Sequence, residues 1–190
     1  YLGDFKFPPL LEISNDFDAV LSDVDLIVCA VPTSGFRQIL KLINKINQSA
    51  PVIWANKGLE QGSAKLPHEI AFEELGDPKE TNRHWGVVSG PTFAAELVRS
   101  LPTALTLAST SQETTIIATN IFHHHNLRVY KSQDVVGASV GGALKNVIAI
   151  ASGISDGMGF GNNARAALIT RGLAEISRFG AHLGANQDTF

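Results

Sequence analysis

The 190-residue sequence is poor in cysteine and in charge, and each shortage excludes a class of protein. Its single cysteine, Cys29, lies inside an apolar run. An internal disulfide is therefore excluded, and we expect Cys29 to pack as a small hydrophobe in a reducing, cytoplasmic environment. Charged residues make up 17% of the chain, the net charge is -3, and no basic run is present. This balance argues against a nucleic-acid-binding protein.

The chain also lacks a set of metal ligands and the glycine-rich turn of a dinucleotide-binding fold. His123, His124 and His125 are adjacent, and on a helix successive side chains point about 100° apart, so they cannot easily hold one metal ion. We therefore predict no metal site. Gly159–Ala164 reads GFGNNA and fits G-x-G-x-x-A. Because it follows a predicted helix rather than a strand, we interpret it as a joint between two helices.

Apolar runs of strand length alternate with segments of helical spacing through the first two thirds of the chain. Strands are predicted over six segments: Leu11–Ser14, Asp25–Pro32, Pro51–Gly58, His84–Pro91, Thr103–Ser109 and Leu127–Ser132. Helices separate them, and the first long one is expected to be capped by Thr33 or Ser34. This order predicts an α/β fold with a Rossmann-like parallel sheet and right-handed crossovers.

After the last predicted strand the pattern changes to two helices, roughly 134–157 and 162–183. We place a domain boundary there. Residues 1–133 are predicted to form the α/β part, and residues 134–190 the start of an all-helical C-terminal domain.

The stretch Val135–Ser155 is almost wholly apolar and small, and its only charge is Lys145. A membrane-spanning helix has a suitable length, but a lysine near its middle costs about 2.5–3.5 kcal/mol. A core helix whose lysine extends to water is a second hypothesis. We favour a third, a helix that lines an active site. In it Gly141 and Gly142 let a ligand approach the backbone, and Lys145 is desolvated, which lowers its pKa toward that of a proton acceptor.

Polar or turn-forming residues follow three of the predicted strands, at Val31–Thr33, Asn56–Gly58 and Ser89–Thr92. Each segment alone has the composition of an ordinary loop. In a parallel sheet, however, the carboxyl ends of the strands share one edge, and ligands bind there. We therefore expect these three segments to lie together at one site.

Together these motifs resemble the bacterial type of NAD(P)-dependent glycerol-3-phosphate dehydrogenase. Four segments carry the resemblance: WANKGLE (Trp54–Glu60), VVSGPTFAAEL (Val87–Leu97), LPTALTLAST (Leu101–Thr110) and GGALKNVIAIASGISDGMGFGNNARAALITRGLAEI (Gly141–Ile176). The resemblance implies that residues 1–133 are the remainder of a dinucleotide-binding domain and that residues 134–190 begin a substrate domain. It also implies interconversion of sn-glycerol 3-phosphate and dihydroxyacetone phosphate with NAD or NADP, feeding glycerophospholipid synthesis.

Two lysines carry the chemistry that the resemblance implies. Lys145, in the GGxxKN motif, corresponds to the proton acceptor of the family. Lys57, in the KGLE motif, corresponds to a residue that contacts both substrate and cofactor. If the two lie close together, their charges repel and the pKa of one or both falls, which suits a group that exchanges protons near neutral pH.

The remaining site residues are also implied by the resemblance. Gly90 and Thr92 correspond to substrate contacts, and Ala94 to a cofactor contact. Pro32 and Phe36, in and after the turn that follows an apolar strand, are weaker cofactor candidates.

The family's glycine-rich fingerprint is expected before Tyr1, and an aspartate and an Arg-Asn pair for the substrate phosphate after Phe190. The fragment by itself is therefore expected to be inactive. The resemblance implies a homodimer in the cytoplasm with a small phosphorylated three-carbon substrate. It implies no nucleic acid, no membrane span and no metal, and the choice between NAD and NADP cannot be read from these residues.

Two other functions fit part of the pattern. A related hydroxyacid or sugar-acid dehydrogenase can share a glycine-rich helix with Lys145 and Asn146, but it would act on a carboxylate substrate. A non-catalytic dinucleotide-binding module would use the same sheet without any proton acceptor.

Overall fold

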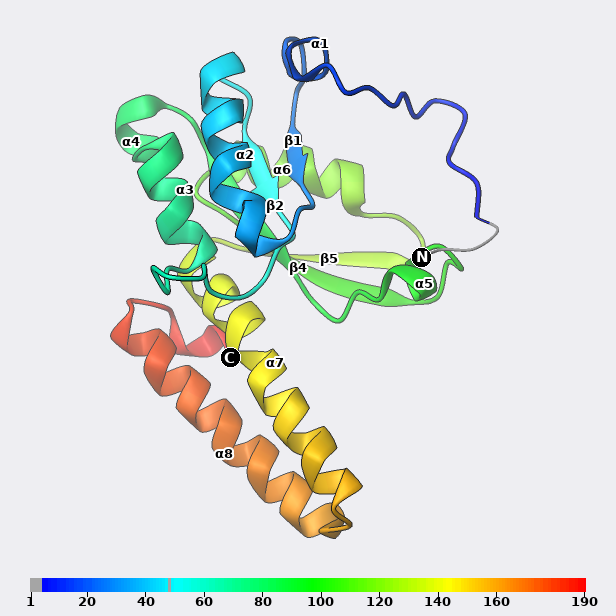
Figure 1. The fold of residues 1–190 in the computed structure, drawn as a ribbon, viewed down its shortest axis with the longest axis vertical. Coiled ribbons are helices and arrows are strands. Elements are labelled where there is room, and N and C mark those ends of the chain that lie inside the picture. Colours follow the sequence, from blue (N-terminus) through cyan, green and yellow to red (C-terminus); the bar gives the residue numbers. More distant parts are fainter. Residues whose placement is uncertain (1–4, 48) are drawn as a thin grey trace.

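The computed structural model describes residues 5–47 and 49–190. Five strands form its sheet: β1 (Ile27–Cys29), β2 (Val52–Trp54), β3 (Trp85–Ser89), β4 (Thr103–Ser109) and β5 (Leu127–Ser132). The helices of the α/β part are α1 (Phe17–Leu21), α2 (Thr33–Ile46), α3 (Pro67–Leu75), α4 (Pro78–Thr81), α5 (Ala94–Leu97) and α6 (Gln112–Phe122). Two long helices and a short 3-10 turn follow: α7 (Val135–Gly157), α8 (Gly161–His182) and η1 (Gln187–Thr189). The predicted α/β class with a helical C-terminal part is confirmed (Figure 1).

The strands lie in the sheet in chain order, β1-β2-β3-β4-β5. The first three are parallel and β4 and β5 are parallel to each other, but β3 and β4 are antiparallel. The expectation of a wholly parallel sheet is therefore wrong at this one junction. The connection from β3 to β4 holds only α5, a four-residue helix about 6 Å long, whereas the five-residue β3 is about 17 Å long. No helix in this connection is long enough to pack along the sheet as a crossover helix does, and β4 runs back beside β3.

Helices cover both faces of the sheet. On one face α2, α3 and the first turns of α7 pack on Trp54, Trp85 and Val87. On the other face α6 packs on a cluster that includes Ile53 and Leu107. Neighbouring residues of β2 thus point into opposite cores, as the alternation of side chains along a strand requires.

The predicted strand Leu11–Ser14 does not form. This segment is exposed, and no described strand lies beside it to complete its backbone hydrogen bonds. The predicted strand over Asp25–Pro32 shortens to the three paired residues of β1. The polar end of the predicted segment lies after the last residue of β1 that pairs with β2, at the carboxyl edge of the sheet.

Cys29 is buried at 4% exposure at the end of β1. Burial raises the pKa of its thiol to about 11. The interpretation of this residue as a small core hydrophobe is confirmed.

α7 and α8 pack against each other and project from the α/β part as a helical hairpin (Figure 1). Residues 158–160 form the joint between the two helices, so the GFGNNA segment does lie at a helix–helix junction, but its last four residues already belong to α8. By length and composition alone α7 could cross a membrane. One such helix is weak evidence for a span, because a core helix passes the same test, and the first turns of α7 are buried against the sheet.

Truncation of a core phenylalanine tests this packing. Phe36 is fully buried and its ring centroid lies 5.5 Å from that of Trp54, whereas Phe72 on α3 is 52% exposed. We expect Phe36→Ala to lower the free energy of unfolding by about 3–5 kcal/mol and Phe72→Ala by less than about 1 kcal/mol. Urea unfolding of both variants measures the difference, and equal losses would contradict the assignment of Phe36 to the core.

Candidate active site

The carboxyl ends of β1, β2 and β3 meet at one edge of the sheet, as predicted from their polar tips. Lys57 follows β2, and its Nζ donates a hydrogen bond of 3.0 Å to the carbonyl oxygen of Gly90, which follows β3. The backbone N–H of Thr92 donates to the same carbonyl, also at 3.0 Å. Hydrogen bonds to one carbonyl oxygen therefore bring Lys57, Gly90 and Thr92 together.

Lys57 is half-buried, and burial is the main reason why its pKa lies below the ordinary lysine value of 10.5. The positive charge of Lys145 lowers the pKa of Lys57 further. The expected repulsion between the two lysines is thus present, and it acts on Lys57.

Lys145 itself is exposed on α7. The expectation of a desolvated Lys145 is wrong in this structure. Most of the buried residues of α7 lie in its first turns and end at Ala143, where the helix passes beyond the sheet. After that point only Ser155 among the α7 residues is buried, and Lys145 faces solvent. The half-buried amine of the site is Lys57 instead.

Gly142 brings the backbone of α7 against the strand ends. A Cβ at this position would lie 2.9 Å from Ser89 Oγ and 3.6 Å from Lys57 Cγ. At Gly141 the nearest atom to such a Cβ is in the ring of Phe190, at 3.7 Å. Protein atoms therefore occupy the space beside the two glycines where we expected a ligand. The lack of a side chain at Gly142 sets the spacing between α7 and Lys57.

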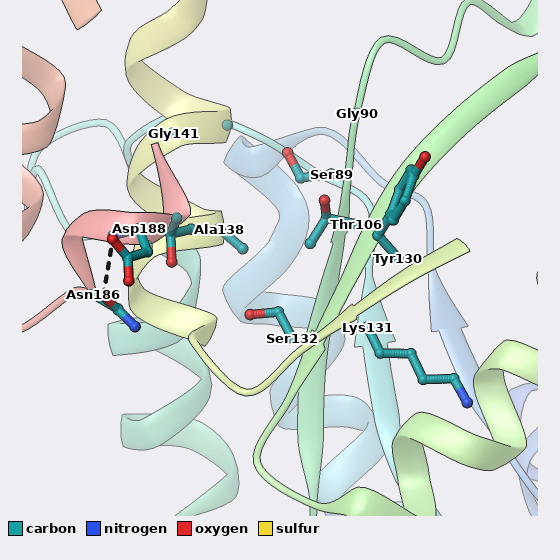
Figure 2. Close-up of a pocket in the computed structure, with 13 residues that line it drawn as sticks. Ser89, Gly90, Thr106, Tyr130, Lys131, Ser132, Ala138, Gly141, Asn186 and Asp188 are labelled. Atoms are coloured by element: carbon teal, nitrogen blue, oxygen red, sulfur yellow. Dashed lines mark hydrogen bonds between the residues drawn. The ribbon is translucent and has the colours of Figure 1, made fainter. Parts of the chain in front are cut away.

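A pocket of about 490 Å³ lies beside this contact, between β3–β5, α7 and the C-terminal turn (Figure 2). The hydroxyl groups of Ser89 and Thr106, paired across β3 and β4, line one side of it. Asn186 and Asp188 line the other. Neither Lys57 nor Lys145 is among its lining residues, so the pocket adjoins the lysine pair without containing it.

The other predicted cofactor contacts lie in different environments. Pro32 is exposed at the start of α2, and Ala94 is exposed at the start of α5, so both are accessible at the edge. Phe36 is fully buried against Trp54, which leaves its side chain no surface for a cofactor, contrary to expectation.

Sequence reasoning missed the contacts of three polar residues, Thr33, Arg37 and Glu60, that involve Lys57 or the segment after it. Thr33, expected to cap α2, instead donates its hydroxyl hydrogen to the Lys57 carbonyl oxygen at 2.7 Å. Arg37, one turn later, donates two hydrogen bonds to Glu60. The spacing of four between Thr33 and Arg37 placed them on one helix face, but nothing in the sequence indicated what that face contacts.

Within residues 5–47 and 49–190 there is no group of three or more potential metal ligands. His123 ends α6, and its Nδ1 accepts a hydrogen bond from the Val129 backbone at 3.2 Å.

Comparison with known proteins gives the same family throughout. The family model described as NAD-dependent glycerol-3-phosphate dehydrogenase N-terminus matches residues 1–115, and the corresponding C-terminus model matches residues 134–190. Glycerol-3-phosphate dehydrogenase [NAD(P)+] of Methylobacillus flagellatus is 60% identical over 190 residues, and that of Aromatoleum aromaticum 49% over 189. Each match covers the whole chain but only 56% of the relative, so the chain spans little more than half of these proteins.

Solved structures agree with the sequence matches. A glycerol-3-phosphate dehydrogenase from Coxiella burnetii superposes with a TM-score of 0.90 at 38% identity, over 100% of this chain and 57% of that one. The enzyme from Saccharomyces cerevisiae gives a TM-score of 0.86 at 29% identity, over 100% of this chain and 56% of that one. With family models that match both parts of the sequence, the chain belongs to the NAD-dependent glycerol-3-phosphate dehydrogenase family.

Proposed function

We propose that this protein interconverts sn-glycerol 3-phosphate and dihydroxyacetone phosphate with NAD or NADP, and so feeds glycerophospholipid synthesis. The observation that carries the proposal is the pair of lysines at the carboxyl edge of the sheet, Lys57 half-buried and Lys145 beside it. Within the described residues neither lysine forms a salt bridge. Two cations without carboxylate partners attract an anionic substrate such as a phosphate monoester.

In this proposal Lys145 accepts the hydroxyl proton when the alcohol is oxidised and returns it when the ketone is reduced. Lys57 polarises the reacting oxygen and contacts both substrate and cofactor. Gly90 and Thr92 contact the substrate. The Gly90 carbonyl, which accepts from Lys57 Nζ and from the Thr92 N–H, ties these groups together.

The residues at this edge fit a dinucleotide. The first turn of α2 has no acidic side chain and no side-chain cap, which suits an anionic ligand at a helix N-terminus. Gly35 leaves open space beside that turn. Pro32 is exposed next to the turn, and Ala94 is exposed at the start of α5. When bound, the nicotinamide supplies or accepts the hydride. Pro32 and Ala94 are our candidates for holding it, together with Lys57.

We also propose the division into residues 1–133 and 134–190, a cytoplasmic location and a homodimer. The division is supported by the end of β5 at Ser132 and the start of α7 at Val135. The homodimer rests on the family resemblance alone.

The decisive test is an assay of the full-length protein for oxidation of NADH and NADPH that depends on dihydroxyacetone phosphate. We expect turnover with at least one cofactor, and a fall of about 10²–10⁴-fold in kcat for Lys145→Ala, the range of general acid–base groups. Lys79→Ala, an exposed lysine on α4, serves as the control and should keep parental activity.

A folded parent protein without turnover would contradict the proposal. Activity on a hydroxyacid instead would favour the related dehydrogenase. Dinucleotide binding without any turnover, unchanged in Lys145→Ala, would favour a non-catalytic module.

The proximity of the two lysines makes a second prediction. The Lys57 pKa should lie below 10.5 and should rise in Lys145→Gln, because the variant removes a positive charge that disfavours the protonated form. NMR titration of lysine side chains labelled at Nζ measures both values. An unchanged Lys57 pKa in the variant would show that the two charges do not interact.

The spacing set by Gly142 makes a third prediction. In Gly142→Ala the new methyl group would meet Ser89 Oγ at 2.9 Å, so Ser89 or α7 must shift and Lys57 with it. We expect kcat/KM to fall about 10-fold, since small misplacements of catalytic groups are costly. Gly153→Ala lies in the same helix with nothing within 4 Å and should keep normal kinetics. Equal kinetics in the two variants would argue against a spacing role.

A further inference from the structure

We propose that Thr33, Arg37 and Glu60 are positioning residues that hold Lys57 in place for the reaction. The inference rests on the proposed function for its kinetic consequence. It concerns three residues to which the family resemblance assigns no role, and it starts from how the segment around Lys57 is held.

Lys57 lies in a segment with no helix or strand of its own. β2 ends at Trp54 and α3 begins at Pro67, and Gly58 between them has a φ of 103°. A lysine side chain also has four rotatable bonds, so its position depends on what fixes the backbone that carries it. Backbone hydrogen bonds from Glu60 to Lys65 and from Ala64 to Glu60 order the later part of the segment, so the part that carries Lys57 depends on contacts from outside.

The first such contact holds Lys57 itself. Thr33, at the start of α2, donates its hydroxyl hydrogen to the Lys57 carbonyl oxygen at 2.7 Å. With the bond from Lys57 Nζ to the Gly90 carbonyl, both ends of the residue are attached, one to α2 and one to the end of β3.

The second contact holds the segment three residues later. Arg37 Nε and Nη2 donate to the two carboxylate oxygens of Glu60 at 2.8 and 2.7 Å. This bidentate geometry fixes orientation as well as distance. The Glu60 side chain is only 16% exposed, and Arg37, followed by Ser63, lowers its pKa to about 2, so the pair stays charged at neutral pH.

Arg37 also contacts α3, which provides a matched comparison. Its Nη1 donates to Glu73 at 2.8 Å and to Glu74 at 2.5 Å. Glu73 also binds Lys65, which lies in the same segment as Lys57, whereas the ion-pair partners of Glu74 are Arg37 and Lys41, both on α2. Glu60 belongs to the segment that carries Lys57, and within the described residues Glu74 forms no ion pair with that segment, so these two carboxylates separate positioning from the general stability of the α2–α3 contact.

The test compares Glu60→Ala, Thr33→Val and Glu74→Ala in the full-length protein. We expect kcat/KM for dihydroxyacetone phosphate to fall about 10-fold in the first two and less than about 2-fold in Glu74→Ala. In a Lys57→Ala background, Glu60→Ala should cause no further loss, because a residue that acts through Lys57 cannot act without it.

NMR titration of Lys57 gives a readout that does not require activity. Release from its half-buried position should raise the Lys57 pKa in Glu60→Ala, whereas the direct effect of removing a negative charge would lower it. Glu74→Ala should not raise this pKa. The sign of the change therefore distinguishes displacement of Lys57 from simple electrostatics.

The positioning role is overturned if the Glu60→Ala and Lys57→Ala losses add, or if Glu60→Ala leaves the Lys57 pKa unraised. If Glu60→Ala does not fold by circular dichroism, Thr33→Val decides by the same two criteria, with Thr33→Ser as the variant that keeps the hydroxyl group. A parent protein inactive with dihydroxyacetone phosphate would refute the proposed function, while the pKa comparison would still decide whether these residues hold Lys57.

Discussion

The close approach of α7 to the end of β3 is the constraint on which the site depends. Small residues make it possible, since the buried face of α7 includes Gly137, Ala138 and Gly142. At Gly142 the helix backbone packs directly against Ser89 and the stem of Lys57. A contact between backbone and strand end has little freedom to adjust, so it fixes where the helix that carries Lys145 stands relative to the sheet.

That geometry places two positive charges together at one edge of an acidic protein. Within the described residues, the ammonium group of Lys57 donates only to a neutral carbonyl group, that of Gly90. Lys145 faces solvent one turn beyond the contact. Burial and mutual repulsion both disfavour the charged form of Lys57. An anionic ligand relieves that repulsion, which is the physical basis of our proposal that the pair binds a phosphorylated substrate.

α2 serves the core and the site at once through its two faces. Phe36, Leu40 and Ile43 bury one face against the sheet and fix the helix as a rigid element. Thr33 and Arg37 on another face reach the segment after β2. The apolar packing that fixes α2 on the sheet thereby also fixes the irregular segment after β2.

The sequence by itself determined the alternation of elements, the bounds of β4 and β5, the shared edge of the first three strands and the family, because apolar periodicity and motif order are local properties. Only the tertiary structure decided that β4 runs antiparallel to β3, because the connection over residues 90–102 is long enough for either direction. It also decided burial at single residues. Phe36 lies in the core. Lys57, rather than Lys145, is the half-buried lysine, because α7 leaves the sheet after Ala143. Such outcomes depend on contacts between residues far apart in the chain, which no local pattern encodes.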